Sequence, residues 1–410
     1  MEKTRNPRWN VARPVSTRIL RIRIICIILF IWLIHQQHLF STYRNALSAK
    51  YAPTEFRGIN LERAYQLNDR AFVLQAELLA RRPSWKKLGA GCEGTTYTFN
   101  DNVIKTFTAG RSPFRNCAPR YAGSRWPAEI PASILFGNGN KDVNNTSMLY
   151  PSARKIRFLP VKAAFYATAS PEAAPEWHLV TPFARNGTLQ SLSKKLRTQK
   201  LVFNVVDTRY RDNFHDLLQS LQGLHNAGFC HDDIKPDNIF VGEEGEWILG
   251  DLGNLRQISH PYHESRLWSD NQQLRDCRAN DVLRALKTYI LFLRGASFDV
   301  GTLDEEFLLR RGPLSEIFWW TMDNAQTMTG DRLRQQSSSE TTLPSMRMDE
   351  QHEKAGSSEF NGVLPVLHLR KMRASRRVEK MLSLGNSESY ARRQAMTWIF
   401  GIQQDACTGV

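Results

Sequence analysis

The spacing of apolar residues changes near the middle of the chain, and this change divides it into two parts. Two short β runs at 95–99 and 103–108 flank the sequence Asn-Asp-Asn, which predicts a hairpin. Further β runs follow at 156–167 and 177–183. At 214–225 apolar residues recur three and four positions apart, which is the spacing of one helix face. The pattern therefore predicts a β-rich first part and a helical second part.

Residues 1–50 form a separate basic segment with an apolar run at 24–34, which extends to 40 across a short polar stretch. The basic residues before the run are Lys3, Arg5, Arg8, Arg13, Arg18, Arg21 and Arg23. This pattern is typical of a signal-anchor that crosses a membrane once. A full span takes about 20 residues, so the short run also fits a cleaved secretory or organelle-targeting signal, or a buried helix of a soluble protein.

The other segments differ in composition. Residues 51–87 contain an amphipathic helical stretch that we expect to pack on the main domain. Residues 326–361 are rich in Ser, Thr, Gln and Glu and poor in large apolar residues, which predicts a disordered insertion. Residues 362–410 are basic and helical in pattern, with a closing helix expected at 390–402. Contact with anionic lipid and a solvated surface both remain open for this basic stretch.

The net charge of +15 is concentrated at the two ends of the chain. Residues 1–57 carry +8 and residues 362–410 carry +5, so the region between them is nearly neutral. A nucleic-acid groove needs a basic surface on the main domain, and this distribution argues against nucleic acid as a partner. The length of 410 residues suits one large two-lobed domain or two ordinary domains.

The cysteines are scattered, with no C-x-x-C pair and no metal-ligand spacing. They are Cys26, Cys92, Cys117, Cys230, Cys277 and Cys407. We therefore expect reduced or buried thiols rather than a disulfide framework. Asn-x-Ser/Thr sequons begin at Asn144, Asn145 and Asn186, but such triplets are common by chance and decide nothing by themselves.

The most informative chemistry lies in LHNAGFCHDDIKPDNIFV, at residues 224–241. Its spacing H-x-D-x-K-x-x-N is formed by His231, Asp233, Lys235 and Asn238. Transfer of a phosphoryl group to a hydroxyl needs a carboxylate to accept the proton, a cation to neutralise charge and an amide to hold magnesium. Four such residues rarely coincide, so a solvated polar loop is the weaker interpretation. The stretch resembles the catalytic loop of the eukaryotic protein kinase superfamily, in its Ser/Thr-like form because of Lys235.

A glycine-rich loop precedes the predicted hairpin, with Gly89, Gly91 and Gly94 at the spacing G-x-G-x-x-G. Glycines allow the backbone to approach phosphate groups closely. A Rossmann loop shares this spacing, but a helix follows it there, whereas here a hairpin follows. The resemblance therefore implies that these glycines cover the phosphates of ATP.

The hairpin places Lys105 where the kinase family has its phosphate-gripping lysine. Such a lysine needs a carboxylate from the next helix. Glu129 is the candidate by elimination, because it is the only acid between Lys105 and Lys141. Pro131 follows two residues later, so the helix must begin close to Glu129.

The run 177–183 continues into a stretch that resembles the kinase hinge. The resemblance implies that Thr181 is the gatekeeper beside adenine and that the C=O of Pro182 and the N–H of Ala184 face the base. An ordinary exit from a strand is the alternative.

Asp251 begins Asp-Leu-Gly, in place of the family's Asp-Phe-Gly. The resemblance implies that Asp251 and Asn238 hold Mg²⁺, and a β-turn Asp-x-Gly is the alternative. Asp281 begins an apolar-striped helix, and in the family such an aspartate ties down the backbone of the catalytic loop. His231 and Asp281 are thus expected to be structural supports.

Two departures from the family matter. Asp232 replaces the arginine that usually precedes the catalytic aspartate, so phosphorylation of the activation segment is not expected to activate the protein. The segment 254–280 contains no Ala-Pro-Glu, which puts the usual peptide-docking surface in doubt. Both departures resemble divergent kinase-like proteins of fungal type.

The resemblance covers residues 88–325 and implies an α+β, two-lobe protein-kinase-like fold with a small β-rich N-lobe and a larger helical C-lobe. It also implies ATP and Mg²⁺ in the cleft and transfer of the γ-phosphoryl group to a Ser/Thr hydroxyl of a protein substrate. In this scheme Asp233 positions the acceptor, Lys235 stabilises the migrating charge, and Lys105 with Glu129 holds the α- and β-phosphates.

Two alternatives stay open, namely a small-molecule kinase of the same fold and a membrane-tethered pseudokinase scaffold. The location of the domain is also open. The positive-inside rule would send it across the membrane, away from cytosolic ATP.

Overall fold

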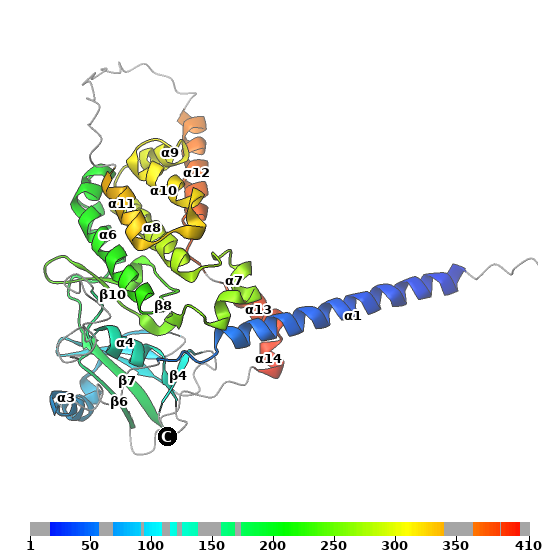
Figure 1. Cartoon of the computed structure of the whole chain (residues 1–410), viewed down its shortest axis with the longest axis horizontal. Coiled ribbons are helices and arrows are strands. Elements are labelled where there is room, and N and C mark those ends of the chain that lie inside the picture. The colour runs from blue at the N-terminus through cyan, green and yellow to red at the C-terminus, as the bar shows by residue number, and fades with distance from the viewer. Residues whose placement is uncertain are drawn as a thin grey trace, which may run out of the picture.

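The computed structural model has a two-lobed body from which one long helix projects (Figure 1). It describes residues 17–56, 69–91, 94–108, 115–120, 125–137, 157–168, 174–339, 364–385 and 387–401. The α+β arrangement that the sequence predicts is confirmed, with the β-rich lobe formed by the first part of the chain and the helical lobe by the second.

The smaller lobe is built on an antiparallel sheet of order β1-β2-β3-β7-β6. Its strands are β1 Lys86–Ala90, β2 Thr95–Phe99, β3 Asn102–Phe107, β6 Ala163–Thr168 and β7 Pro175–Pro182. The predicted hairpin turn is confirmed between β2 and β3, where Asn100 and Asp101 have φ of 44° and 57°. A two-residue turn of this hand needs positive φ at both positions, which Asn and Asp tolerate better than most residues.

Helices cover both faces of this sheet. They are α3 Asp69–Ala80 and α4 Glu129–Gly137, and a small sheet of β4 Cys117–Pro119 and β5 Arg125–Pro127 precedes α4. On one face, Leu78 of α3 shares a buried cluster with Ile104. On the other face, Ile130 of α4 shares a cluster with Leu179. Because Lys105 pairs with Leu179 across the sheet, its side chain lies on the α4 face.

The larger lobe is organised around α8, which is buried along most of its length. Its helices are α5 Leu189–Arg197, α6 Phe203–Asn226, α8 Cys277–Ala296, α9 Val300–Leu308, α10 Pro313–Asp323, α11 Gly330–Ser339 and α12 Leu364–Met381. Leu217 and Leu221 of α6 share one main core with Val282 and Leu286 of α8. Val378 of α12 is buried in the same core, so the basic segment packs on this lobe.

Short elements at the junction of the lobes carry the residues with predicted chemistry. They are β8 Phe229–Cys230, η5 Pro236–Asn238, β9 Ile239–Val241, β10 Trp247–Leu249, η6 Leu252–Asn254, β11 Arg256–Gln257, η7 Pro261–Glu264 and α7 Arg266–Asp270. β9 pairs with β10, and β8 pairs with β11. These pairings bring the loop after β8 next to the segment that follows Asp251.

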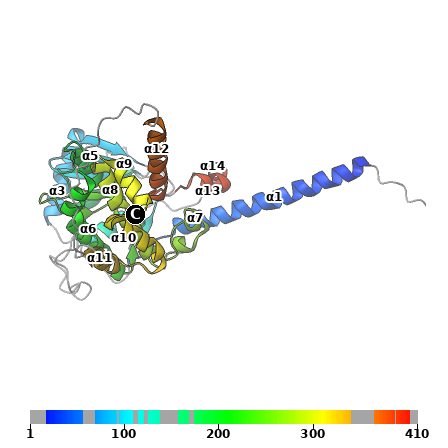
Figure 2. The same ribbon diagram turned by 90° about the horizontal axis from the view of Figure 1, so that it is seen from above.

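Helix α1 (Thr17–Lys50) projects far beyond the body (Figures 1 and 2). Between Ile24 and Ile34 its large apolar side chains are 47% to 64% exposed. The hypothesis that this run is a buried helix of a soluble protein is therefore wrong. Within the part of the chain that the structure describes, α1 is the one helix that is long and apolar enough to cross a membrane.

The C-terminal end of α1 packs on the larger lobe. Tyr43 and Leu47 are buried in a cluster with Tyr262 and Trp268, and the Tyr43 hydroxyl donates a hydrogen bond of 2.6 Å to Asp270. Two short helices lie beside this end, α13 Ser389–Gln394 and α14 Thr397–Phe400 (Figure 1). The closing helix expected at 390–402 is thus broken in two, because Met396 takes the left-handed φ of 46°.

The composition of the segment 326–361 predicts a disordered insertion, and this prediction is wrong for part of the segment. α11 occupies residues 330–339, and Leu333 is fully buried in the main core. Few apolar residues suffice here because α11 also forms polar contacts with α6, including one between His215 and the Ser337 hydroxyl at 2.7 Å. The rest of the predicted insertion, 340–361, lies outside the described residues.

The expectation of reduced thiols is also wrong. Cys230, at the end of β8, is disulfide-bonded to Cys277, the first residue of α8, across a Cα–Cα distance of 6.0 Å. Cys117 is disulfide-bonded as well. Their wide spacing in sequence conceals these bonds, because the fold brings β8 and α8 together from positions 47 residues apart. Among the described cysteines, Cys26 on α1 is the free one.

Candidate active site

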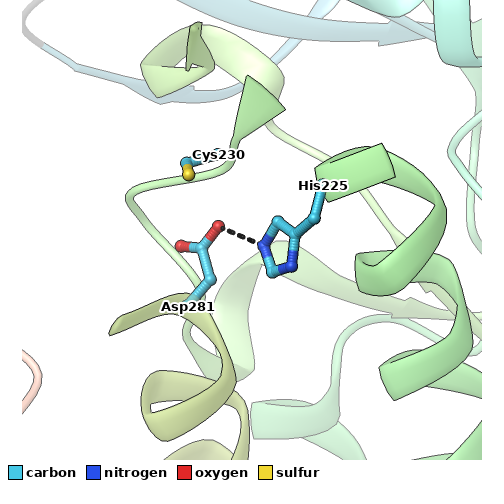
Figure 3. A group of neighbouring side chains, drawn as sticks. All are labelled: His225, Cys230 and Asp281. Carbon is cyan, nitrogen blue, oxygen red and sulfur yellow. Dashed lines mark hydrogen bonds and ion pairs between the residues drawn. The ribbon is translucent and has the colours of Figure 1, made fainter. Parts of the chain in front are cut away.

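The loop after β8 is held in place by one buried carboxylate, that of Asp281 on α8. Its two oxygens accept hydrogen bonds from the backbone N–H of His231 at 2.7 Å and of Asp232 at 3.0 Å. His225 at the end of α6 lies 3.2 Å from the same carboxylate (Figure 3). The His231 ring also contacts the carbonyl of Gly250 at 3.1 Å. The loop that carries Asp233 is therefore fixed from α6, α8 and β10 together.

His225, Cys230 and Asp281 lie close enough together to resemble a metal site (Figure 3). The sulfur of Cys230 is bonded to Cys277, however, and a disulfide sulfur is not the thiolate that metals need. Asp281 is moreover engaged with backbone N–H groups. The group therefore acts as a structural support of the loop.

The Asp233 carboxylate lies among groups that the sequence predicts and others that it does not. Lys235 Nζ is 2.8 Å from Asp233 Oδ2. Asn238 donates to the Asp233 carbonyl at 2.8 Å and to its Oδ2 at 3.2 Å. Asn254 approaches the same oxygen at 3.4 Å, and buried Arg284 of α8 approaches Oδ1 at 3.6 Å. The last two residues had no recognisable signal in sequence.

Lys105 joins the two lobes through its ammonium group. Lys105 Nζ forms an ion pair with the buried carboxylate of Glu129, the first residue of α4, and lies 3.3 Å from Asp251 Oδ1. The positive charge of Lys105 lowers the pKa of Asp251, although burial acts in the opposite direction. The structure thus brings together all three residues, including Glu129, which the sequence reached only by elimination.

The residues around this group fit ATP and Mg²⁺. A Cβ on Gly94 would lie 1.6 Å from the Thr106 carbonyl oxygen, so glycine is required there. A Cβ on Gly89 or Gly91 would have no atom within 4 Å. The Asn238 amide nitrogen is directed to Asp233, which leaves its oxygen available to a cation, and the Asp251 carboxylate could supply a second oxygen ligand. These are the hard oxygen ligands that Mg²⁺ prefers.

The predicted hinge lies at the end of β7. Thr181 is buried there, and Pro182 and Ala184 are half-buried as the chain leaves the sheet. The Phe183 N–H donates to the Asp101 carbonyl at 3.0 Å, which ties this exit to the β2–β3 turn.

Asp232 makes a buried ion-pair network that the sequence did not predict. Its carboxylate accepts from Arg256 at 3.1 Å and contacts His263 Nε2 at 3.0 Å, both from the segment after Asp251. Arg256 in turn donates to the Asn116 amide oxygen at 2.8 Å and to the Lys50 carbonyl at 3.3 Å. This network ties the segment to the loop, to Asn116 just before β4, and to α1.

The network shifts the pKa of its members. Burial alone would raise the pKa of Asp232, but the charges of His263 and Arg256 hold it at about 2. For His263, burial acts to lower the pKa. The charge and hydrogen bond of Asp232 outweigh burial, so the pKa of His263 is raised.

A cavity of about 380 Å³ opens beside Asp233. Its walls come from four distant parts of the chain and consist of Lys50, Asp232, Asp233, Lys235, Asn254, Arg256, Tyr262, Leu384 and Gly385. The cavity thus lies where the end of α1, the loop that carries Asp233 and the segment after α12 meet.

Comparison with known proteins gives one family. A model of the protein kinase domain matches residues 164–288. Serine/threonine-protein kinase 16 of Mus musculus is 24% identical over 159 residues, which cover 37% of this chain and 52% of that protein. Serine/threonine-protein kinase LATS2 of Homo sapiens is 32% identical over 133 residues, which cover 26% of this chain and 12% of that protein. The chain thus spans about half the length of the first of these relatives.

The buried network predicts a specific pH dependence of stability. His263 has a raised pKa, so its contribution is fully present below its ordinary pKa of 6.5 and is lost as pH rises through the raised value. Asp232 has a lowered pKa, so its contribution is present above its ordinary value of 3.8 and is lost as pH falls towards about 2. The network should therefore stabilise the fold most between these two ordinary values.

We expect Asp232→Asn to lower the free energy of unfolding by about 3–5 kcal/mol near pH 5.5, because it leaves buried Arg256 without its counter-ion. This difference should shrink as the pH rises through the raised pKa of His263. Thermal unfolding of the wild type, Asp232→Asn and His263→Gln from pH 4 to 9 measures it, and His263→Gln should remove the alkaline decline. A difference that is constant over this range would contradict the assignment.

Proposed function

Since the chain belongs to the eukaryotic protein kinase superfamily, we propose that it transfers the γ-phosphoryl group of Mg²⁺-bound ATP to a Ser or Thr hydroxyl of a protein substrate. The observation that carries this proposal is the arrangement around Asp233, with Lys235 Nζ at 2.8 Å and the Asn238 amide at 3.2 Å from its carboxylate. A scaffold without activity has no need of this set.

The roles follow from the contacts. Asp233 accepts the proton of the acceptor hydroxyl and orients its attack, while Lys235 beside it offsets the negative charge that moves with the phosphoryl group. Lys105, aimed by its ion pair with Glu129, binds the α- and β-phosphates. Asn238 and Asp251 would hold Mg²⁺, which neutralises phosphate charge when bound. Gly89 and Gly91 leave room for the backbone to approach the phosphates.

A kinase for small hydroxylated acceptors is the second candidate, and one observation favours it. α1 packs on η7 and α7, and Tyr262 and Trp268 are buried beneath it. This is the segment that lacks Ala-Pro-Glu, so little of it is free to bind an extended peptide. The cavity of about 380 Å³ beside Asp233 is within the range of small-ligand sites.

We infer that α1 anchors the chain in a membrane by a single pass and that the kinase domain lies on the oxidising side of it. The exposed apolar run and the basic residues before it support the anchor. The disulfides of Cys230 and Cys117 support the location of the kinase domain on the oxidising side, because such bonds persist mainly in oxidising compartments. Helix α1 continues unbroken into the domain, with about 24 Å between Ile34 and Lys50.

The catalytic proposal predicts that Asp233→Asn lowers kcat by about 10²–10⁴-fold, because the base is lost while the fold is kept. Exposed Asp237 in the same loop offers a matched control, and Asp237→Asn should retain activity. Asp251→Asn should abolish the Mg²⁺-dependent rise in Tm that ATP produces. Phosphate transfer to a generic protein and thermal shift with the full chain in detergent measure both effects.

Two results would contradict the catalytic proposal. An unchanged rate of phosphate transfer in Asp233→Asn would show that Asp233 is not the catalytic base. A wild-type protein that ATP and Mg²⁺ neither stabilise nor activate would favour a scaffold.

The topology proposal predicts N-linked glycan on the chain made in eukaryotic cells. Asn186 of the sequon Asn-Gly-Thr is exposed and can carry a glycan. The change of all three sequon asparagines to Gln should therefore remove an increase in apparent mass that glycosidase treatment also removes. The Cys230–Cys277 bond should resist alkylation unless the protein is unfolded and reduced. An unglycosylated chain whose domain thiols alkylate without reductant would place the domain in a reducing compartment.

A further inference from the structure

The cavity beside Asp233 has more positive than negative groups in its wall. Lys50, Lys235 and Arg256 line it, against the carboxylates of Asp232 and Asp233. Two of the three cations form ion pairs within the wall, Lys235 with Asp233 at 2.8 Å and Arg256 with Asp232 at 3.1 Å. The third cation, Lys50, has its counter-ion outside the cavity lining.

Lys50 is paired with Glu388 of the C-terminal segment. That carboxylate also accepts from Arg392 at 2.6 Å, so one acid serves two cations. Behind the catalytic loop, buried Arg284 adds a further positive charge 3.6 Å from Asp233. An anion that enters the cavity therefore meets an excess of positive charge in a partly buried setting, where charge interactions are stronger than in water.

Tyr262 gives independent evidence for a ligand. The side chain is 1% exposed and lines the cavity, and its hydroxyl finds no hydrogen-bond partner among the residues that the structure describes. Two cations lie near its ring, with Lys50 Nζ 5.2 Å and the Arg256 guanidinium 4.7 Å from the ring centre. Burial raises the pKa of this hydroxyl, so it stays protonated and can donate.

A buried donor without a partner is unfavourable and is rare in folded proteins. A bound carboxylate or phosphate would accept from the Tyr262 hydroxyl and pair with the ammonium group of Lys50 at the same time. Tyr262 and Lys50 line the same cavity as Asp233, so such an anion would sit close to the acceptor hydroxyl.

We propose that this cavity, built from the end of α1, η7 and the segment after α12, selects acceptors in which the reacting hydroxyl is flanked by an anionic group. The inference rests on the proposed phosphotransfer and specifies its substrate class. The acceptor oxygen forms a bond to the γ-phosphorus while the bond from that phosphorus to the β–γ bridging oxygen breaks. The acceptor proton passes to Asp233, and ADP leaves.

The flanking anion has two possible sources, an acidic neighbour of Ser in a protein or the phosphate of a small metabolite. The test therefore has two arms, run with the full chain in detergent. One arm compares Ser peptides that differ only in flanking Glu, Ala or Lys residues. The other compares glycerol 3-phosphate with glycerol. We expect the KM of the anionic acceptor to be at least tenfold lower in one arm, and that arm identifies the source.

Variants assign this preference to the cavity. Tyr262→Phe removes only the hydroxyl, and Lys50→Met removes the charge while Glu388 keeps Arg392. Each should raise the KM of the anionic acceptor about tenfold, with kcat, the KM for ATP and the KM of the neutral acceptor unchanged. Tyr390→Phe, at an exposed tyrosine of α13 outside the cavity, is the matched control.

Failure of the acid selection and failure of the phosphotransfer give different outcomes. Equal KM values for all acceptors in both arms would overturn acid selection and leave the phosphotransfer intact. An acid preference that survives in both Tyr262→Phe and Lys50→Met would overturn the assignment to this cavity. Failure to phosphorylate any acceptor, while ATP and Mg²⁺ still raise Tm, would overturn the phosphotransfer itself and the inference with it.

Discussion

The buried ion pair between Asp232 and Arg256 is the contact on which the arrangement around Asp233 depends. Arg256 bonds to the loop through Asp232, to the smaller lobe through Asn116 and to α1 through the Lys50 carbonyl. A buried charge without its partner costs several kcal/mol, so these segments must move together or not at all. The segment after Asp251 is thereby held against the loop that carries Asp233 by groups that the chain itself supplies.

Two further constraints act on the same loop from behind. The carboxylate of Asp281 on α8 accepts hydrogen bonds from the backbone N–H groups of His231 and Asp232. The Cys230–Cys277 disulfide joins α8 to the residue just before His231. Asp233 therefore projects from a loop that is fixed on both sides. We infer from this that the proposed activity needs no phosphate on the activation segment, since Asp232 already has cationic partners where the family has an arginine that awaits a phosphate.

The sequence predicted those parts whose chemistry is local. The hairpin followed from its Asn-Asp turn, and the group of Lys105, Glu129 and Asp251 followed from motif order and elimination. Contacts between distant segments could not be predicted in this way. The partners of Asp232 come 24 and 31 residues later in the chain, and the disulfide joins cysteines 47 residues apart, without any regular spacing that would reveal them. Lys50 enters the cavity wall only because the C-terminal end of α1 packs on the larger lobe.

The most direct test of this account is the rate of phosphate transfer from ATP by full-length protein that has been treated with phosphatase and shown by mass spectrometry to carry no phosphate. We expect a Mg²⁺-dependent rate equal to that of untreated protein, because the Asp232–Arg256 pair already orders the segment. A rate that disappears on treatment and returns when a site between Asn254 and Asn280 is phosphorylated would contradict it.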